Sequence, residues 1–185
     1  MTVAAPVPMT VIVPAPDHAS QLSRVRIGDG RLAVIRPARA EDRPLLVAAL
    51  HALSARSRYQ RFLTPIPRLP ERDVDRLMDL DAARQVVLHA TDEPGLSLVA
   101  VARFAFTGAR EAELAITVGD CWQRQGLGGA LLTRLIRTAG ERGVTRLTGE
   151  AFSDNRAITA LLRSHGFHRN GPVSVTVQWA RELIA

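Results

Sequence analysis

The sequence contains no lysine, one cysteine and few aromatic residues among its 185 residues. The single cysteine, Cys121, excludes an internal disulfide framework and every metal site that needs several cysteines. Since the five histidines show no metal-ligand spacing either, we expect no bound metal. This use of cysteine is typical of a cytoplasmic protein. A lone cysteine usually behaves as a small apolar residue, so we expect Cys121 to be buried.

The 24 basic residues are all arginines, and the formal net charge is +6. Such an excess can indicate nucleic-acid binding. The arginines are scattered singly, however, and aromatic residues make up only 4% of the chain, too few for a surface that stacks bases. The charge therefore indicates anionic ligands or acidic protein surfaces rather than nucleic acid. No stretch approaches the roughly 20 apolar residues of a membrane span, so we expect no membrane partner.

The length of the chain suits one domain whose core is large enough to be stable without disulfides. Residues 1–22 contain four prolines, at positions 6, 8, 14 and 16, and lack the positively charged start of a signal peptide. We therefore expect a flexible tail over 1–22 and one domain over 23–185. The sequence leaves both a monomer and a homodimer open.

Alternating and helix-periodic apolar runs predict an α/β fold of the α+β type. We expect a mixed, mostly antiparallel, twisted sheet of about seven strands, flanked by four to five helices. The strands are expected at 24–27, 32–36, 85–90, 96–106, 111–118, 146–151 and 173–179. The helices are expected at 45–53, 54–63, 71–80, 127–142 and between Ser153 or Asp154, as the N-cap, and Gly166.

A glycine-rich turn, 123–130, joins the expected strand 111–118 to the helix that follows. Such a turn leaves main-chain N–H groups unpaired at a helix N-terminus, where the dipole favours negative charge, so it predicts a phosphate or pyrophosphate ligand. A P-loop is excluded because no Gly-Lys-Ser/Thr is present. A Rossmann fingerprint fits poorly, because it needs a small residue at Leu131 and a parallel sheet before Glu150. An acyl-CoA pyrophosphate loop and a plain tight turn remain.

Two motifs carry a resemblance to a known family. The pattern Gln123-x-x-Gly126-x-Gly128, followed by Asn155-Arg156-Ala157-Ile158 and Gly166-Phe167, resembles the signatures of the GCN5-related N-acetyltransferases (GNAT). The resemblance covers about residues 24–180, and the order of the expected elements matches as well. It implies the GNAT fold, in which the strands expected at 111–118 and 146–151 splay apart.

The resemblance implies that acetyl-CoA is the cosubstrate. The main chain of three residues on the splayed strand, Ile116, Thr117 and Val118, would bind the pantetheine arm. The pyrophosphate would be held by the N–H groups of Arg124, Gln125, Gly126, Leu127, Gly128 and Gly129. Asn155 would reach the pantetheine or pyrophosphate from the facing helix, and its alternative role is to cap that helix.

Acetyl transfer to an amine also needs a base, because only a neutral amine attacks a thioester and a free lysine side chain has a pKa of about 10.4. Glu113 is the candidate, since 112–118 resembles the segment that carries the base in protein lysine acetyltransferases of the family. The alternative is an outward-facing strand carboxylate, with Glu111 as the second choice for the base. Many family members place a tyrosine that protonates the CoA thiolate where this chain has Leu162, so the general acid stays unknown.

The segment 53–62 resembles the corresponding segment of bacterial Pat-type protein lysine acetyltransferases, which modify acyl-CoA synthetases. By this resemblance Arg58 and Arg61 would contact an acidic protein surface and Tyr59 would line the lysine channel, unless the aromatic residues simply pack the helix. The implied activity is direct transfer of an acetyl group to a primary amine, chiefly a protein lysine. A small-molecule amine (a polyamine, amino acid or antibiotic) is the alternative acceptor, and a non-catalytic acyl-CoA sensor is the other alternative. Because the chain has no lysine, it cannot modify a lysine of its own.

Overall fold

A computed structural model describes residues 22–65 and 70–183 of the chain. The predicted tail at 1–22 lies outside the described residues apart from Leu22, so this prediction and that of a single domain over 23–185 stay predictions. None of the helices in the described ranges has both the length and the apolar character needed to cross a membrane.

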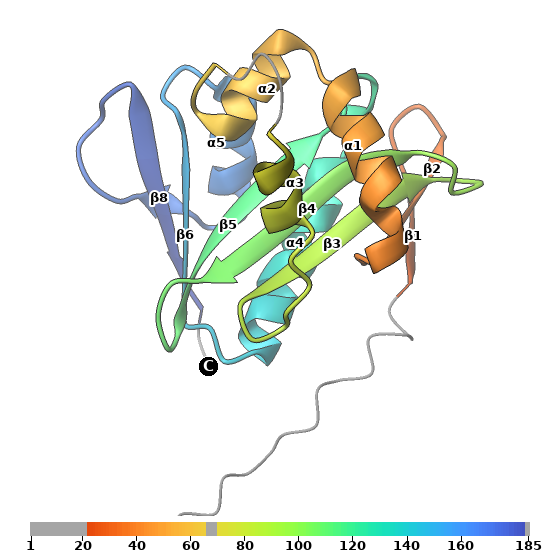
Figure 1. The fold of residues 1–185 in the computed structure, drawn as a ribbon. Coiled ribbons are helices and arrows are strands. Elements are labelled where there is room, and N and C mark those ends of the chain that lie inside the picture. The colour runs from red at the N-terminus through yellow and green to blue at the C-terminus, as the bar shows by residue number, and fades with distance from the viewer. Residues whose placement is uncertain (1–21, 66–69, 184–185) are drawn as a thin grey trace, which may run out of the picture.

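Eight strands form one mixed sheet in the order β1-β2-β3-β4-β5-β6-β8-β7 (Figure 1). Neighbouring strands are antiparallel except for β5 and β6, which are parallel. The strands are β1 (Ser23–Arg26), β2 (Leu32–Pro37), β3 (Gln85–Asp92), β4 (Leu98–Phe106), β5 (Glu111–Val118), β6 (Arg146–Phe152), β7 (His168–Arg169) and β8 (Thr176–Glu182).

Helices cover both faces of the sheet (Figure 1). The long helix α4 and helix α5 pack on one face, and α1 and α3 pack on the other, where α2 also lies against β5. The α-helices of the described residues are α1 (Arg43–Ala52), α2 (Ala55–Phe62), α3 (Glu71–Leu77), α4 (Leu127–Glu141) and α5 (Arg156–Ser164). The predicted α+β fold, with a mixed and mostly antiparallel sheet, is confirmed.

The apolar stripe of α4 forms the centre of the main core. Leu127, Leu131, Leu132 and Leu135 recur at helical spacing and are all 0% exposed. Complete burial of a leucine side chain stabilises the fold by about 1.5–3 kcal/mol. This core therefore fixes the position of the first turn of α4, which is the end of the helix nearest the glycine-rich turn.

A buried ionic cluster attaches the start of α1 to the opposite face of the sheet. The Asp42 carboxylate accepts two hydrogen bonds from Arg36, at 2.6 and 2.7 Å, and lies 2.8 Å from Nδ1 of His89. Burial would raise the pKa of Asp42, but hydrogen bonds from Arg36, the Arg39 amide and His89 lower it to about 2. Burial lowers the pKa of His89, which indicates a neutral ring. Arg36, the Arg39 amide and His89 thus all bind the carboxylate of Asp42.

The pairing of β5 with β6 stops after three residue pairs, the last of which is Glu113 with Thr148. Both strands continue, β5 to Val118 and β6 to Phe152, without further pairing between them. The predicted splay of these two strands is therefore confirmed. It leaves the main chain of β5 beyond Glu113 without a strand partner on this side.

Three local predictions were wrong, and one short strand was missed. The N-cap of α5 is Asn155 rather than Ser153 or Asp154, because the Asn155 side chain accepts a hydrogen bond from the Ile158 amide. The last strand begins at Thr176 rather than 173, since the preceding segment is exposed and pairs with no strand. The two-residue strand β7 is too short for a periodic pattern and was missed. Cys121 is exposed, because it lies in a 3-10 turn, Asp120–Trp122, at the surface.

Candidate active site

A cleft of about 650 Å³ opens where β5 and β6 separate. Its walls are the stretches of β5 and β6 that do not pair with each other, the start of α4, one face of α5 and the inner side of α2. The described residues that line it are Ser57, Gln60, Arg61, 114–118, Gln123, Arg124, Gly126, Gly128, Gly129, 149–151, Asn155, Ala157, Ile158, 160–162, Ser164 and His165.

The glycine-rich turn forms one end of this cleft. Arg124 and Gly126 both have positive φ angles, 61° and 92°, and helix α4 starts directly after them. Within the described residues, the N–H groups of 124–129 donate to no other main-chain group, and the last three of them belong to the first turn of the helix. Unpaired amides at a helix N-terminus favour an anion. Of the residues predicted to bind pyrophosphate, Arg124, Gly126, Gly128 and Gly129 line the cleft, whereas Gln125 and Leu127 do not, and the binding itself stays a prediction.

The turn is held from outside by the β1–β2 hairpin. The Gly28 amide donates to the carbonyl oxygen of Gln125 at 3.1 Å, and the Asp29 amide donates to Gln125 Oε1 at 3.1 Å. Arg31 donates to the carbonyl oxygen of Cys121 at 2.7 Å, and its guanidinium lies 4.0 Å from the centre of the Trp122 ring. The side chain of Gln125 therefore anchors the turn and does not line the cleft, which the sequence did not reveal.

Gly128 and Gly129 keep the space between α4 and α5 open. A Cβ on Gly128 would lie 3.4 Å from Cδ2 of Leu161 and 3.7 Å from Cγ2 of Val118. A Cβ on Gly129 would lie 3.7 Å from Cε1 of His165. Side chains at these two positions would fill the cleft where a ligand has to pass close to the backbone.

Asn155 caps α5 and also lies at the edge of the cleft. Its Oδ1 accepts a hydrogen bond from the Ile158 amide at 3.2 Å, so the side chain caps α5. The residue also lines the cleft. Its amide nitrogen makes no hydrogen bond to another described residue and remains available to a ligand.

A network of polar side chains joins α2 to the end of β5. The Asp120 carboxylate accepts hydrogen bonds from the Ser54 amide, at 2.8 Å, and from the hydroxyls of Ser54 and Ser57, at 2.9 and 2.7 Å. Partial burial would raise the pKa of Asp120, but these hydrogen bonds lower it. Gln123 Nε2 donates to the Ser57 hydroxyl, at 3.2 Å, and to the carbonyl oxygen of Val118, at 3.0 Å. The network fixes α2 over the cleft, and no pattern in the sequence revealed it.

Of the residues expected to hold pantetheine, 116–118 all line the cleft. The carbonyl of Val118 is already engaged by Gln123, and the Thr117 hydroxyl is buried without a hydrogen-bond partner in the described part of the chain. The main chain of 114–117 is therefore the stretch of β5 most open to a ligand.

Glu113 lies just outside the cleft, on the face of the sheet that carries α2. It is exposed and does not line the cleft, whereas Arg61 does. Burial and the positive charge of Arg103 lower the pKa of Arg61 to about 10, and the negative charge of Glu113 opposes this shift. Arg103 is itself held by a 2.8 Å hydrogen bond to Gln85 Oε1. Glu113 therefore faces two positive charges.

The other two residues expected to contact an acceptor, Arg58 and Tyr59, do not line the cleft. Arg58 folds back onto α1, where it donates to the His51 carbonyl at 3.4 Å. The Tyr59 ring stacks on Phe152 at the end of β6, with ring centres 4.5 Å apart, and it is 41% exposed. Tyr59 thus holds α2 against β6, and a role of either residue in acceptor binding stays a prediction.

The position of the missing tyrosine holds a buried leucine. Leu162 lines the cleft and is 2% exposed. The nearby His165 lies 2.8 Å, through Nδ1, from the carbonyl oxygen of Leu161 and 3.2 Å, through Nε2, from the hydroxyl of Thr133. Since both ring nitrogens are engaged, His165 is not placed to donate a proton to a leaving group.

The mixed sheet, the cleft between its two parallel strands and the helix N-terminus at one end of that cleft together define an acyltransferase of the GNAT fold. The model of the acetyltransferase (GNAT) family matches residues 47–167. The chain belongs to this family of acetyltransferases, whose members use acetyl-CoA, and the family prediction is confirmed.

Similar proteins and structures are acetyltransferases as well. The chain is 31% identical over 144 residues to an acetyltransferase of Pseudomonas aeruginosa, which covers 76% of this chain and 77% of that protein. It is 30% identical over 141 residues to acetyltransferase Pat of Mycolicibacterium smegmatis, covering 75% of this chain but only 42% of that protein. The crystal structure of the GNAT domain of S. lividans PAT has a TM-score of 0.81 at 30% identity, covering 88% of this chain and 97% of that one.

Proposed function

We propose that this protein transfers the acetyl group of acetyl-CoA directly to a primary amine, and that the acceptor is a lysine side chain of another protein, such as an acyl-CoA synthetase. The observation that carries the proposal is the cleft between β5 and β6, which has free amides at one end and charged side chains at the other. The similarity to two Pat proteins at 30% identity supports a protein acceptor.

The donor would lie along β5. Its pyrophosphate would accept hydrogen bonds from the amides of 124–129, and its pantetheine arm would run beside 114–118, with Asn155 on the other side. From Val118 back to Leu114 the strand spans roughly 13 Å. The thioester would therefore reach the point where β5 and β6 separate. Charge-assisted hydrogen bonds contribute about 1.5–3 kcal/mol each, so a few of them suffice for micromolar affinity.

The acceptor would enter from the face that carries α2. Arg61, Arg58 and Tyr59 are the proposed contacts on this side, and the arginines suit an acidic protein surface. Glu113 is the proposed base that takes a proton from the acceptor ammonium, directly or through water. Its place next to the end of the β5–β6 pairing supports this role.

The test is a screen of acceptors that measures CoA release by the purified protein. We expect release with acyl-CoA synthetases or other lysine-containing proteins. Release with small amines alone would favour a polyamine, amino acid or antibiotic as substrate. Tight binding of acetyl-CoA with no release for any acceptor would favour the acyl-CoA sensor, an alternative that the buried Leu162 in place of a tyrosine supports. We propose the cytoplasm as the location and a monomer or homodimer as the assembly.

A further inference from the structure

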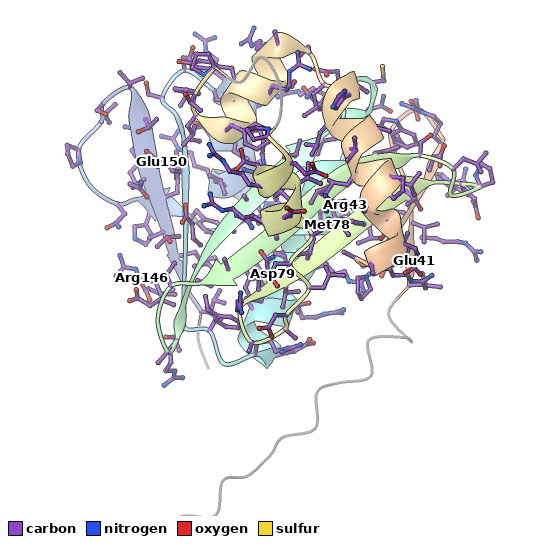
Figure 2. The ribbon with its side chains drawn as sticks, viewed as in Figure 1. Glu41, Arg43, Met78, Asp79, Arg146 and Glu150 are labelled. Atoms are coloured by element: carbon purple, nitrogen blue, oxygen red, sulfur yellow. The ribbon has the colours of Figure 1, made fainter. Side chains whose placement is uncertain are left out.

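The cleft contains one carboxylate, and it is not Glu113. Among the described residues that line the cleft, Glu150 on β6 is the only acidic one, and Figure 2 labels it beside β8. Glu150 is exposed and forms no ion pair with another described residue. A carboxylate without an ion pair would repel the donor's phosphates and suits a cationic group instead.

The position of Glu150 follows from the way in which the two strands separate. Gly149 lies against Leu114 at the point of separation, since a Cβ on Gly149 would be 3.4 Å from Cγ of Leu114. Glu150 is the next residue of β6, and successive strand residues point to opposite faces. Leu147 and Ala151 belong to the core that α4 fills. Glu150 therefore points to the α2 face, from which the acceptor would enter.

One oxygen of Glu150 is held in place and the other is free. The hydroxyl of Thr176, on the neighbouring strand β8, donates a short hydrogen bond to Oε1 of Glu150. Oε2 has no hydrogen-bond partner among the described residues. On the opposite wall, the residue of β5 that follows Leu114 is Ala115, whose small side chain leaves room in front of the carboxylate.

Amide formation from a protonated amine involves two proton transfers, and Glu113 accounts for only one of them. A protonated amine loses two protons on its way to an amide: one before nitrogen attacks the thioester carbon, and one as the C–N bond forms and the C–S bond breaks. The electron pair of the C–S bond leaves on sulfur as a thiolate, which takes up one proton, and the other proton goes to solvent. No tyrosine hydroxyl is present at Leu162 to protonate the thiolate.

Resting on the proposed function, we propose that Glu150 is a second catalytic carboxylate: its free oxygen binds the acceptor ammonium and then carries the second amine proton to the leaving thiolate. Glu113 takes the first proton and releases it to solvent. The two carboxylates lie on the α2 face on either side of the point of separation. This division also makes a cationic amine, rather than a hydroxyl or a thiol, the favoured acceptor.

The test compares Glu150→Gln with Glu182→Gln in the full chain, using a lysine-containing peptide and acetyl-CoA. Glu182 is also on the β6–β8 ladder but pairs with Arg146, away from the cleft. We expect Glu150→Gln to lower kcat/KM about 100-fold at pH 7.5, with at least a tenfold rise in the KM for peptide and an unchanged Kd for acetyl-CoA. Glu182→Gln should behave as wild type.

The dependence on pH separates a catalytic role from a structural one. At pH 9.5 a larger fraction of lysine amines is neutral and needs no carboxylate to bind an ammonium group, so the deficit of Glu150→Gln should shrink to about tenfold or less. Equal activity of Glu150→Gln and Glu182→Gln would overturn the proposal while leaving the proposed function intact, and so would a deficit that is the same at both pH values. Absence of CoA release from wild type with every amine would overturn both.

A second variant guards against a folding defect in Glu150→Gln. Thr176→Val removes the hydroxyl that orients the carboxylate but keeps the carboxylate itself. We expect the KM for peptide to rise about fivefold, in keeping with the loss of one hydrogen bond to a charged group. A wild-type KM in folded Thr176→Val, checked by circular dichroism, would contradict the orientation that the proposal requires.

Discussion

At the proposed donor end of the cleft the candidate binding groups are main-chain amides in the first turn of α4, whereas at the proposed acceptor end they are the side chains of Arg61 and Glu150, with Glu113 just outside the cleft. The amides are fixed by the helix and by the hairpin that holds Gln125. The acceptor groups come from α2, β5 and β6, three elements far apart in the sequence. The comparison teaches that recognition of the donor depends on local backbone geometry, and that recognition of the acceptor depends on how distant elements meet.

The largest effect on activity is expected for a variant of the acceptor end, Glu113→Gln. Removing the proposed base should lower kcat about 100- to 1,000-fold. The Kd for acetyl-CoA, measured by calorimetry, should change less than twofold, because the amides of 124–129 are untouched. An unchanged kcat would disprove the assignment of the base and would leave Glu150 as the alternative.

The second prediction concerns the buried ionic cluster that attaches α1 to the sheet, and the variant is Asp42→Asn. The folded-state pKa of Asp42, about 2, lies below the unfolded value of about 3.9. Its contribution to stability is therefore present above pH 4 and is lost as the pH falls from about 4 to 2, and a shift of this size corresponds to about 2.6 kcal/mol.

Urea unfolding at pH 6 and pH 3 measures the effect of Asp42→Asn. We expect the free energy of unfolding of the variant to be about 2–3 kcal/mol lower than that of wild type at pH 6. Between pH 6 and pH 3 it should fall less than that of wild type. Asp75→Asn is the matched control, because the side chain of Asp75 is 61% exposed in its pair with Arg43, and such pairs contribute little. The same pH dependence in Asp42→Asn and wild type would refute the role of this carboxylate.

The third prediction concerns the donor end, in Gly128→Val. A branched side chain at this position would fill the gap to Leu161, so the Kd for acetyl-CoA should rise about 30-fold, or roughly 2 kcal/mol. Gly140→Ala lies in the same helix and its Cβ would meet no atom within 4 Å. This control should keep the wild-type affinity and gain about 0.5–1 kcal/mol in stability. Unaltered binding by Gly128→Val would mean that the donor does not pass this point.

The smallest effect is expected for Arg61→Gln. The variant should raise the KM for an acidic protein acceptor about tenfold, the expected loss from one charge-assisted contact, with little change in the Kd for acetyl-CoA. Added salt should reduce the difference between variant and wild type, since salt screens the attraction between Arg61 and an approaching acidic surface. A rise in the Kd for acetyl-CoA instead would show that Arg61 contacts the donor rather than the acceptor.

Much of the donor site could be predicted because its signals are local. The glycines of the turn, the strand before it and the apolar stripe of α4 lie within a short segment, and each has a direct backbone consequence. The acceptor side could not be predicted in the same way. Arg58, a predicted acceptor contact, folds back onto α1, and Glu150, which was weighed only as part of a Rossmann fingerprint, lines the cleft.

The sequence by itself determined the family, the order of the elements and the glycine-rich turn at 123–130, because glycine at positive φ and a helix start are encoded by neighbouring residues. Only the tertiary structure decided where the parallel strands separate, at Leu114 and Gly149, and which carboxylate faces the opening. The physical reason is that strand pairing joins segments more than thirty residues apart. A one-residue shift in that pairing would turn Glu150 to the other face of the sheet.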